Sequence, residues 1–508
     1  MRNATRVLAS RNSTRNSRNP FSPPRRRDTG KSKVSRRTLP SLRPSPGLSA
    51  VKTFPGLRWG LAGFLLICCC AIPAAAREEV QRDFHKTVAL TPGRSFRIEN
   101  SNGNVTVRTQ SKGEVDIHAT IRCSAGSASE ARSFCGQIQI VVDAGSGVSV
   151  HTQYPSNWSS HNLSYGVHYD VTMPETAPLE LRNRFGEVNV ANLHAPGIIR
   201  NSNGAVILSG SRGRQEIENA FGAVEVRGNE GDLSIRNGNG EVSASDIAGT
   251  VDITNRFGQV RVTHAGRGVT IHGNNGGIEV ENVTGAVLVG NSFGGVVVSD
   301  AKSDVTVQNQ NGSVRVTGVA GTADLRTSFD RVTFSRIGKM LNVHASNATV
   351  SGDTVGESAT VETTFGSVDL RGVKAGARVT SGNSAIRLSG IGGDVYAKTS
   401  FAGIDIGDVA GAVTVESMNG SVTVVAKPGQ RCQPISLNTS FSPIRVTVPN
   451  GIGYNVIART SFGQIHSQAD MTISGNVGSD TLNGKISGGG CELRLTDQNG
   501  SIDILKGK

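Results

Sequence analysis

The sequence predicts an all-β protein built as a parallel β-helix, or β-solenoid, from 18-residue units. From residue 179 to residue 425, fourteen consecutive units repeat an apolar-x-apolar strand, a corner of Phe or Asn that is mostly followed by Gly, and a second alternating strand without one insertion. The alternating positions are apolar and mostly β-branched, which is typical of strands with one buried face. Glycine occupies 63 of 508 positions while aromatic residues make up 5%, a composition that supports many turns and argues against a helical bundle.

The invariant spacing distinguishes a solenoid from a series of hairpins. A hairpin closes its own turn, so its length can drift from one unit to the next. In a solenoid each coil stacks on the previous one at roughly 4.8 Å, and an added residue would break the ladder with both neighbours. We therefore expect residues 179–425 to form the regular solenoid.

The corner position alternates between Phe and Asn, and each series steps by 36 residues. We expect both series to form a structural ladder along the corners: Phe185, Phe221, Phe257, Phe293, Phe329, Phe365 and Phe401, interleaved with Asn203, Asn239, Asn275, Asn311, Asn347, Asn383 and Asn419. A coil of 18 residues would place every Phe between two Asn, whereas a coil of 36 would stack Phe on Phe and Asn on Asn. Like-on-like stacking favours 36 residues, with 18 as the alternative. Phe rings that fill the interior would each contribute strongly to stability.

A second column of Asn residues lies two positions before the corner. It comprises Asn183, Asn201, Asn219, Asn237, Asn255, Asn291 and Asn309, with Gly273 as the one interruption, and later units place Thr327, Thr363 and Thr399 there. Turn propensity accounts for one such Asn but not for seven in phase. The spacing predicts a stack of amides that pass hydrogen bonds along the solenoid axis.

The chain begins with two segments unlike the repeat. Residues 1–58 are rich in Arg, Ser, Asn and Pro, and we expect a disordered basic leader. Residues 59–76 carry no charge and end in a small-residue site at Ala74–Ala76, which indicates the apolar core and cleavage site of a signal peptide. The alternative is a membrane anchor, since 18 uncharged residues can just span a bilayer. Either way we expect an exported protein in the periplasm, at the cell surface or outside the cell, attached to the membrane if residues 59–76 are retained.

The net charge of +13 comes from the leader. Residues 1–58 hold 15 Lys or Arg and one acidic residue, whereas residues 77–508 hold 38 basic and 39 acidic residues. The folded part is close to neutral, so we expect no nucleic-acid partner.

The regions on either side of the regular solenoid are predicted to be caps. Residues 77–178 form an N-terminal β cap with one unit-like stretch and an insert flanked by Cys123 and Cys135, a pair close enough in sequence for a local disulfide. Residues 426–508 lose the 18-residue step and form irregular terminal coils, where Cys432 and Cys491 are the second candidate pair. Capping protects the open ends of a β-solenoid from edge-to-edge association.

The stretch Phe96–Val107, which reads FRIENSNGNVTV, and the serial units of the type Ile217–Val226, IENAFGAVEV, resemble the bacterial putative-adhesin family over about residues 88–508. That family is an exported β-repeat domain of unknown function. The resemblance implies a β-solenoid at the bacterial envelope and brings no catalytic residues. The long basic leader and the Cys123/Cys135 insert depart from the family pattern.

The sequence contains no nucleophile elbow, zinc-protease motif or phosphate-binding loop. Calcium-binding repeats are also absent from it, so we expect no cofactor and no metal. The weak ligand-binding candidates are aromatic and titratable residues outside the repeat that could line a glycan or peptide site: Tyr154, Trp158, His168, Tyr169 and Asp170. The alternative is a loop that only covers the end of the solenoid.

These observations favour a non-enzymatic, adhesin-like protein that binds or scaffolds at the cell envelope. Its expected partner is an envelope or extracellular polymer, either glycan or protein, because a flat repetitive face can bind without long loops. One alternative is a scaffold whose solenoids stack end to end under envelope stress. Another is a polysaccharide lyase or hydrolase, which would need convergent carboxylates in a cleft. Fourteen units without insertion leave little room for such a cleft.

Overall fold

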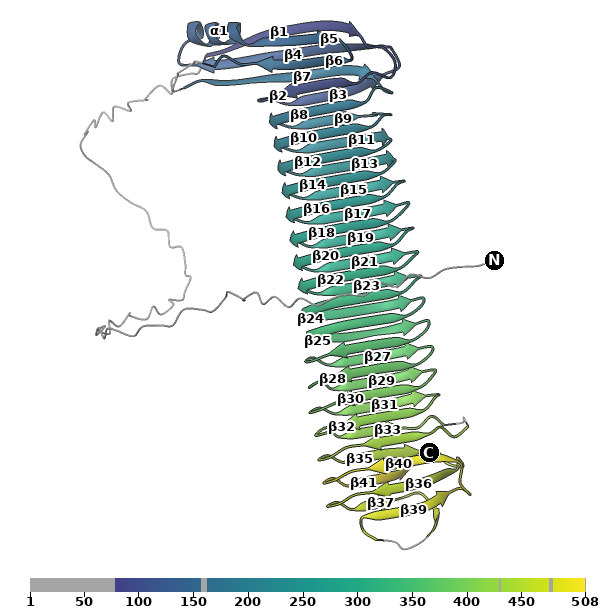
Figure 1. The fold of residues 1–508 in the computed structure, drawn as a ribbon. Coiled ribbons are helices and arrows are strands. Elements are labelled where there is room, and N and C mark those ends of the chain that lie inside the picture. The colour runs from purple at the N-terminus through teal and green to yellow at the C-terminus, as the bar shows by residue number, and fades with distance from the viewer. Residues whose placement is uncertain (1–77, 157–161, 429–430, 475–477, 508) are drawn as a thin grey trace, which may run out of the picture. The chain divides into compact units, whose positions relative to one another are not determined.

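The computed structural model describes residues 78–156, 162–428, 431–474 and 478–507, which belong to one compact unit (Figure 1). The predicted leader and apolar segment lie outside the described residues. Within the described ranges the chain forms strands and one short helix, and no helix there is long and apolar enough to cross a membrane. The predicted all-β solenoid is confirmed.

The solenoid consists of two parallel ladders of strands that face each other, with one strand of each coil in each ladder. The first ladder contains β8 (Leu179–Phe185), β10 (Gly197–Asn203), β12 (Gln215–Phe221), β14 (Leu233–Asn239), β16 (Val251–Phe257), β18 (Val269–Asn275), β20 (Val287–Phe293), β22 (Val305–Asn311), β26 (Ala359–Thr363), β28 (Ala377–Ser381), β30 (Val395–Thr399), β32 (Val413–Ser417) and β34 (Ile435–Asn438). The second contains β9 (Val188–Ala191), β11 (Val206–Arg212), β13 (Val224–Glu230), β15 (Val242–Ile247), β17 (Val260–Ala265), β19 (Ile278–Val283), β21 (Val296–Ala301), β23 (Val314–Val319), β27 (Val368–Val373), β29 (Ile386–Ile391), β31 (Ile404–Val409), β33 (Val422–Val425) and β35 (Ile444–Val448). Two long strands, β24 (Ala323–Ile337) and β25 (Leu341–Val355), pass through both ladders.

One coil contains 18 residues, so the favoured 36-residue coil is wrong. Strand β10 lies between β8 and β12, with Asn201 paired to Asn183 on one side and Asn219 on the other. The same register places Asn203 between two Phe. About 15 such coils follow one another, which at roughly 4.8 Å per coil gives a stack of about 70 Å.

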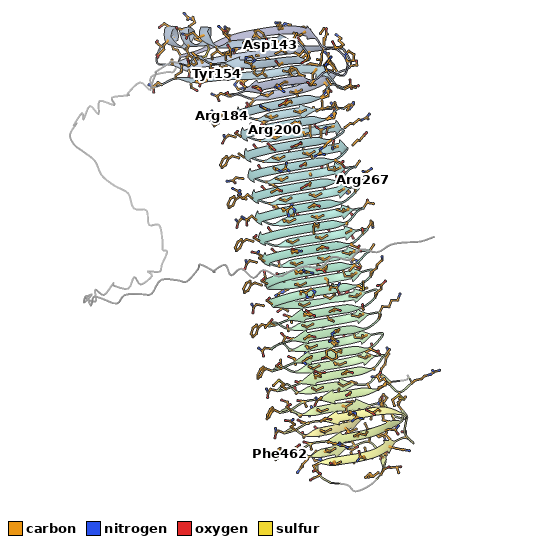
Figure 2. The ribbon with its side chains drawn as sticks, viewed as in Figure 1. Asp143, Tyr154, Arg184, Arg200, Arg267 and Phe462 are labelled. Carbon is orange, nitrogen blue, oxygen red and sulfur yellow. A yellow bond between two sulfur atoms is a disulfide. The ribbon has the colours of Figure 1, made fainter. Side chains whose placement is uncertain are left out.

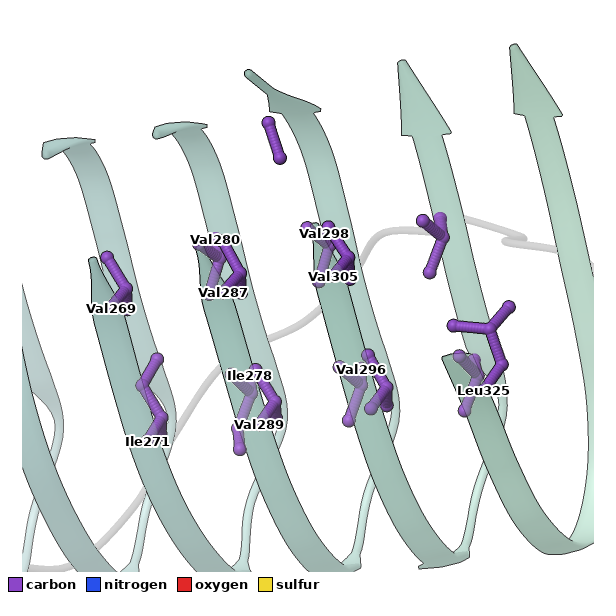
Figure 3. Close-up of a cluster of buried hydrophobic side chains, with 14 of the residues drawn as sticks. Val269, Ile271, Ile278, Val280, Val287, Val289, Val296, Val298, Val305 and Leu325 are labelled. Atoms are coloured by element: carbon purple, nitrogen blue, oxygen red, sulfur yellow. The ribbon is translucent and has the colours of Figure 1, made fainter. Parts of the chain in front are cut away.

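The Phe residues lie outside the core, which explains why their alternation does not set the coil length. Phe257 and Phe293 are 45% and 51% exposed, so rings that stacked on one another would gain little buried contact. The register is set instead by the inward-facing Val, Ile and Leu, which recur every 18 residues and are fully buried between the ladders (Figure 3). The expectation that Phe fills the interior is therefore also wrong.

Glycine is favoured at the corner because successive coils approach closely there. Four coils have a different residue at this position, namely Asp330, Ala348, Ser384 and Ala402. Gly204 has a φ of +132°, and a Cβ at this position would lie 2.1 Å from the carbonyl oxygen of Gly186 in the preceding coil. The buried Asn column holds the same corner from within. The amide of Asn201 donates to the carbonyl oxygens of Gly186 (3.2 Å) and Gly204 (3.1 Å), so this side chain ties its own corner to the corner of the coil before it.

The N-terminal cap extends both ladders, and the part of it that lies next to the regular solenoid is one complete coil. Its elements are β1 (Glu78–Ala89), β2 (Phe96–Asn100), β3 (Val105–Gln110), β4 (Glu114–Ala125), α1 (Ala128–Gln137), β5 (Gln139–Ala144), β6 (Val148–Gln153) and β7 (Ser164–Pro174). Strands β2 and β3 stack on β8 and β9. Beyond them, β6 and β5 continue the first ladder and β7, β4 and β1 continue the second, ending in antiparallel pairs.

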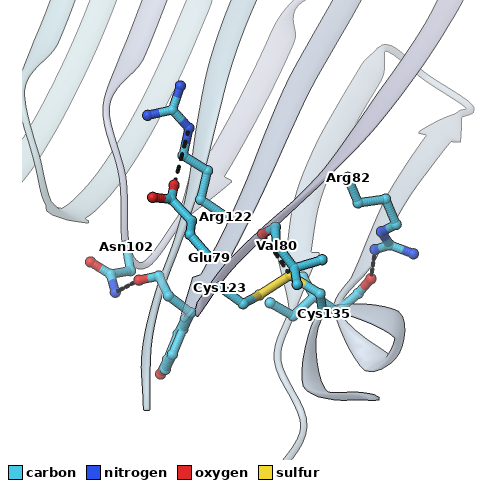
Figure 4. The surroundings of a disulfide bond; sticks show 9 residues. Glu79, Val80, Arg82, Asn102, Arg122, Cys123 and Cys135 are labelled. Carbon is cyan, nitrogen blue, oxygen red and sulfur yellow. Dashed lines mark hydrogen bonds and ion pairs between the residues drawn. A yellow bond between two sulfur atoms is a disulfide. The ribbon is translucent and has the colours of Figure 1, made fainter. Parts of the chain in front are cut away.

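Two disulfides join segments of the caps. Cys123 of β4 is bonded to Cys135 of α1, which fixes the helix against the sheet (Figure 4). The helix starts at Ser127, whose hydroxyl accepts a hydrogen bond from the backbone of Glu130. In the C-terminal cap Cys432 is bonded to Cys491.

The C-terminal cap is closed by the last strands, which turn back into the stack. Its strands are β36 (Tyr454–Arg459), β37 (Ile465–Ser467), β38 (Met471–Ile473), β39 (Thr481–Ile486), β40 (Cys491–Thr496) and β41 (Ile502–Lys506). Strand β40 lies between β34 and β36, and β41 lies between β35 and β37. The antiparallel strands β39 and β38 then cover the end of the first ladder.

Candidate functional site

The four described ligand-binding candidates from the sequence lie on two different faces of the N-terminal cap. Trp158 lies outside the described residues. Tyr169 is 2% exposed and points into the cap, whereas its neighbours His168 and Asp170 lie on the opposite, outer face of β7. Alternation along a strand thus separates residues that are adjacent in sequence.

Tyr154 and Tyr169 close the end of the Asn column. The Tyr154 hydroxyl donates to Oδ1 of Asn100 (3.0 Å), and the Tyr169 hydroxyl lies 2.6 Å from Oγ1 of Thr152. Burial raises the pKa of Tyr154 to about 12. Inside the column the Oδ1 atoms of Asn183 and Asn201 have no such partner. The two tyrosines therefore belong to the structure of the cap and not to a ligand site.

His168 and Asp170 are also engaged with other residues. Nδ1 of His168 accepts a hydrogen bond from the backbone of Asn104 (3.2 Å), and burial together with Arg122 lowers the pKa of this imidazole. Both carboxylate oxygens of Asp170 accept from Nη1 of Arg108, at 2.8 and 2.9 Å. Asp170 is thus held in an ion pair.

The most regular surface feature is a row of exposed aromatic rings at one edge of the solenoid. We call it the Phe row; its eight members are 45% to 62% exposed and are Phe185, Phe221, Phe257, Phe293, Phe329, Phe365, Phe401 and Phe441. They lie on alternate coils, so successive rings are about 10 Å apart along the axis. Each ring exposes about 100 Å², so the Phe row is a line of separate aromatic contact points along the solenoid.

Two polar hollows lie on the first ladder directly beside the Phe row. The larger, about 900 Å³, crosses β18 to β28 and is lined by residues such as His272, Gln308, Arg326 and Glu362. The smaller, about 690 Å³, crosses β2 to β14. In both hollows the lining residues lie next to the buried Asn column and come from successive coils. Each hollow is therefore elongated along the solenoid axis.

Most of the arginines at the smaller hollow are paired with carboxylates: Arg182 lies 2.8 Å from Glu180, and Arg236 lies 3.8 Å from Glu216. Arg182, Arg184, Arg200 and Arg236 line this hollow together with Glu99 and Glu218. Arg200 pairs with Glu218 at 3.0 Å, while the guanidinium of Arg184 lies 5.5 Å from the ring centre of Phe185. Figure 2 shows Arg184 at the same edge as the exposed ring of Phe462. Cationic and aromatic groups are therefore adjacent on one surface.

One group of side chains could hold a metal ion, and the sequence interpretation missed it. In the part of the chain that the structure describes, three potential ligands, His85, Asp116 and His118, offer atoms that all lie within 4.8 Å of one another. His85 is 31 positions from Asp116, and only the pairing of β1 with β4 brings them together. The only signal for this group in the sequence is the presence of two His residues in predicted strands of the same cap.

No family model matches the chain, and no curated protein matches its sequence. The solved structures to which it is similar include a putative cell adhesion protein from Clostridium sporogenes, 8% identical over 84% of this chain and 100% of that protein, with a TM-score of 0.13. They also include a putative adhesin from Bacteroides fragilis, 10% identical over 60% of this chain and 98% of that protein, with a TM-score of 0.14. TM-scores this low carry no argument about function.

Proposed function

We propose that this protein is a non-enzymatic, adhesin-like scaffold that binds an extended polysaccharide along the Phe row and the polar hollows beside it. The observation that carries the proposal is the Phe row itself. Its eight exposed rings recur at every second coil over the whole solenoid, so they offer an extended partner a regular row of stacking surfaces. The resemblance of the repeat to the putative-adhesin family agrees with this proposal.

The repeat of the Phe row suits a glycan. An extended β-linked polysaccharide presents the same ring face at every second sugar, a repeat comparable with two coil spacings, about 10 Å. Aromatic faces stack on sugar rings, and the Asn, Ser and Gln side chains around the hollows can bond sugar hydroxyls. In the described part of the chain Arg184 makes no ion pair, so its guanidinium beside the ring of Phe185 can pair with a carboxylate of an anionic glycan such as one containing uronic acid.

The two alternatives have less support. A lyase or hydrolase needs a free carboxylate, but Asp170, its candidate, is held by Arg108. Stacking of solenoids end to end needs a free coil edge, but the strands β39 and β38 cover the C-terminal end of the first ladder.

Co-sedimentation with insoluble envelope and matrix polymers tests the proposal. The panel contains peptidoglycan, neutral and acidic capsule glycans, and matrix proteins. We expect the mature protein to bind an acidic glycan and the variant F293A/F329A to bind it at least about ten-fold more weakly, since each lost stacking contact contributes about 1 kcal/mol. The matched control is V297A/V425A, which removes two exposed apolar side chains from the second ladder. Equal binding by both variants, or binding only to proteins, would contradict the proposal.

A further inference from the structure

The outer face of the N-terminal cap carries a pair of stacked histidines. His85 of β1 lies directly opposite His118 of β4 in the antiparallel register. Their ring centres are 4.0 Å apart and the ring planes differ by 15°. Both side chains are more than half exposed, so solvent and ions reach them.

A single carboxylate faces both imidazoles. Nε2 of His85 lies 2.6 Å from Oδ1 of Asp116, and Nε2 of His118 lies 3.2 Å from Oδ2 of the same residue. Zinc binds imidazole nitrogen and carboxylate oxygen at roughly 2.0–2.2 Å, so the ligand atoms of a tetrahedral site are about 3.4 Å apart. The three atoms of this group are already gathered within 4.8 Å. The stacked rings, which are exposed and free to turn, would have to rotate apart so that both Nε2 atoms point towards one ion.

The surroundings orient the carboxylate and keep other ligands away. The hydroxyl of Thr87 donates to Oδ1 of Asp116 at 2.8 Å, as an outer partner does for a metal-ligating carboxylate. Asp170, which is opposite His118 on β7, is held by Arg108. The protein therefore supplies three ligands and leaves the remaining position to water or to a donor from another molecule.

Other histidines near acidic residues lack this arrangement. His264 approaches Asp246 at 3.6 Å and His344 approaches Glu362 at 3.1 Å, but each of these pairs offers one imidazole. In the described residues the group on β1 and β4 is the one that combines two imidazoles with a carboxylate.

We propose that His85, Asp116 and His118 bind one divalent transition-metal ion of the zinc class. Two imidazoles and one carboxylate suit zinc and its neighbours in the first transition series better than calcium or magnesium, which prefer oxygen ligands. Strand β1 pairs only with β4 among the described strands, so the ion joins this outermost strand to the rest of the sheet. The site is independent of the polysaccharide surface.

Metal titration of the chelator-treated full chain tests the site. We expect one Zn²⁺ or Co²⁺ per chain by calorimetry, and the visible absorption of bound Co²⁺ reports four-coordination. H85A and H118A should each weaken binding by about ten-fold or more, and T87V should weaken it less, because Thr87 only orients the carboxylate. The matched control H264A removes an exposed histidine beside an aspartate and should leave binding unchanged.

Hydrogen exchange provides a second readout. Bound Zn²⁺ should slow amide exchange in β1 of the wild type and have no such effect in H118A. If H118A does not fold, H118Q replaces it, because the shorter amide fills similar space. Zinc affinity that is equal in the wild type and in the H85A/H118A double variant would overturn the proposal, as would calcium binding in preference to zinc.

Discussion

The interior columns and the Phe row repeat at different periods, although the same coils carry both. The inward Val, Ile and Leu and the Asn column recur every 18 residues, which is one coil. Phe recurs every 36 residues, which is two coils. Packing against both neighbours forces the shorter period on the interior. The Phe rings are about half exposed, so the packing does not force the longer period on the edge, and the alternation of Phe with Asn is a property of the surface.

The largest expected loss of stability comes from a shift of strand register, and removal of a whole coil is the variant to compare it with. Deleting residues 276–293 removes one 18-residue coil and leaves the Asn275 corner joined to Gly294, so every remaining coil stays in register. Deleting Val297 alone reverses the facing of β21 and should cost about 4 kcal/mol or more. Thermal unfolding measures both.

A coil of 36 residues makes the opposite prediction for two deletions. It requires the deletion of 276–311 to be clearly more stable than the deletion of 276–293. The 18-residue coil predicts similar melting temperatures for the two.

The next largest effect compares a buried side chain with an edge ring in the same strand. Ile253 is fully buried in β16, and Ile253→Ala should cost about 2–5 kcal/mol. Phe257 is half exposed at the end of that strand, and Phe257→Ala should cost about 1 kcal/mol or less. Urea unfolding of the two variants provides the comparison. Equal losses of unfolding free energy would mean that Phe257 belongs to the core.

The Asn column should respond to loss of hydrogen bonding more than to loss of volume. The amide of Asn255 donates to the carbonyls of Gly240 (3.1 Å) and Gly258 (3.0 Å). Asn255→Ala removes both bonds and leaves the Gly258 carbonyl without its side-chain donor, whereas Gly240 still accepts from Asn237, so the variant should lose about 1–3 kcal/mol. Asn255→Thr should cost less, since the hydroxyl of Thr327 donates to a corner carbonyl at the same position of a later coil. Equal losses in urea unfolding would contradict this account.

The smallest expected loss of stability concerns Tyr154, at the end of the Asn column. Tyr154→Phe removes the donor to Asn100 and should cost about 1 kcal/mol at neutral pH. Because burial raises the pKa of Tyr154 from 10 to about 12, its contribution is complete below pH 10 and is lost as the pH rises towards 12. The variant should therefore lose stability less steeply over that interval than the wild type, as measured by unfolding at a series of pH values.

The sequence predicted the parts of the fold that repeat and missed those that depend on register between distant segments. The Val columns and the corner glycines were predictable because the same residue types recur at the same position in most units. The coil length was misjudged because an exposed Phe and a buried Phe have the same spacing in sequence. The pairing of His85 with His118 depends on the antiparallel register of β1 and β4, which no repeat encodes. The partner of Tyr154, Asn100, is likewise 54 positions away.

The stability of a variant without the central part of the Phe row tests the account most directly. In F221A/F257A/F293A/F329A four rings are removed from the middle of the solenoid. If the rings lie at the surface, the free energy of unfolding should fall by about 4 kcal/mol or less in total, at most about 1 kcal/mol for each ring, and binding to the acidic glycan should be lost. If the rings were part of the core, the loss would approach 3–5 kcal/mol for each ring, and a decrease of that size would contradict the account.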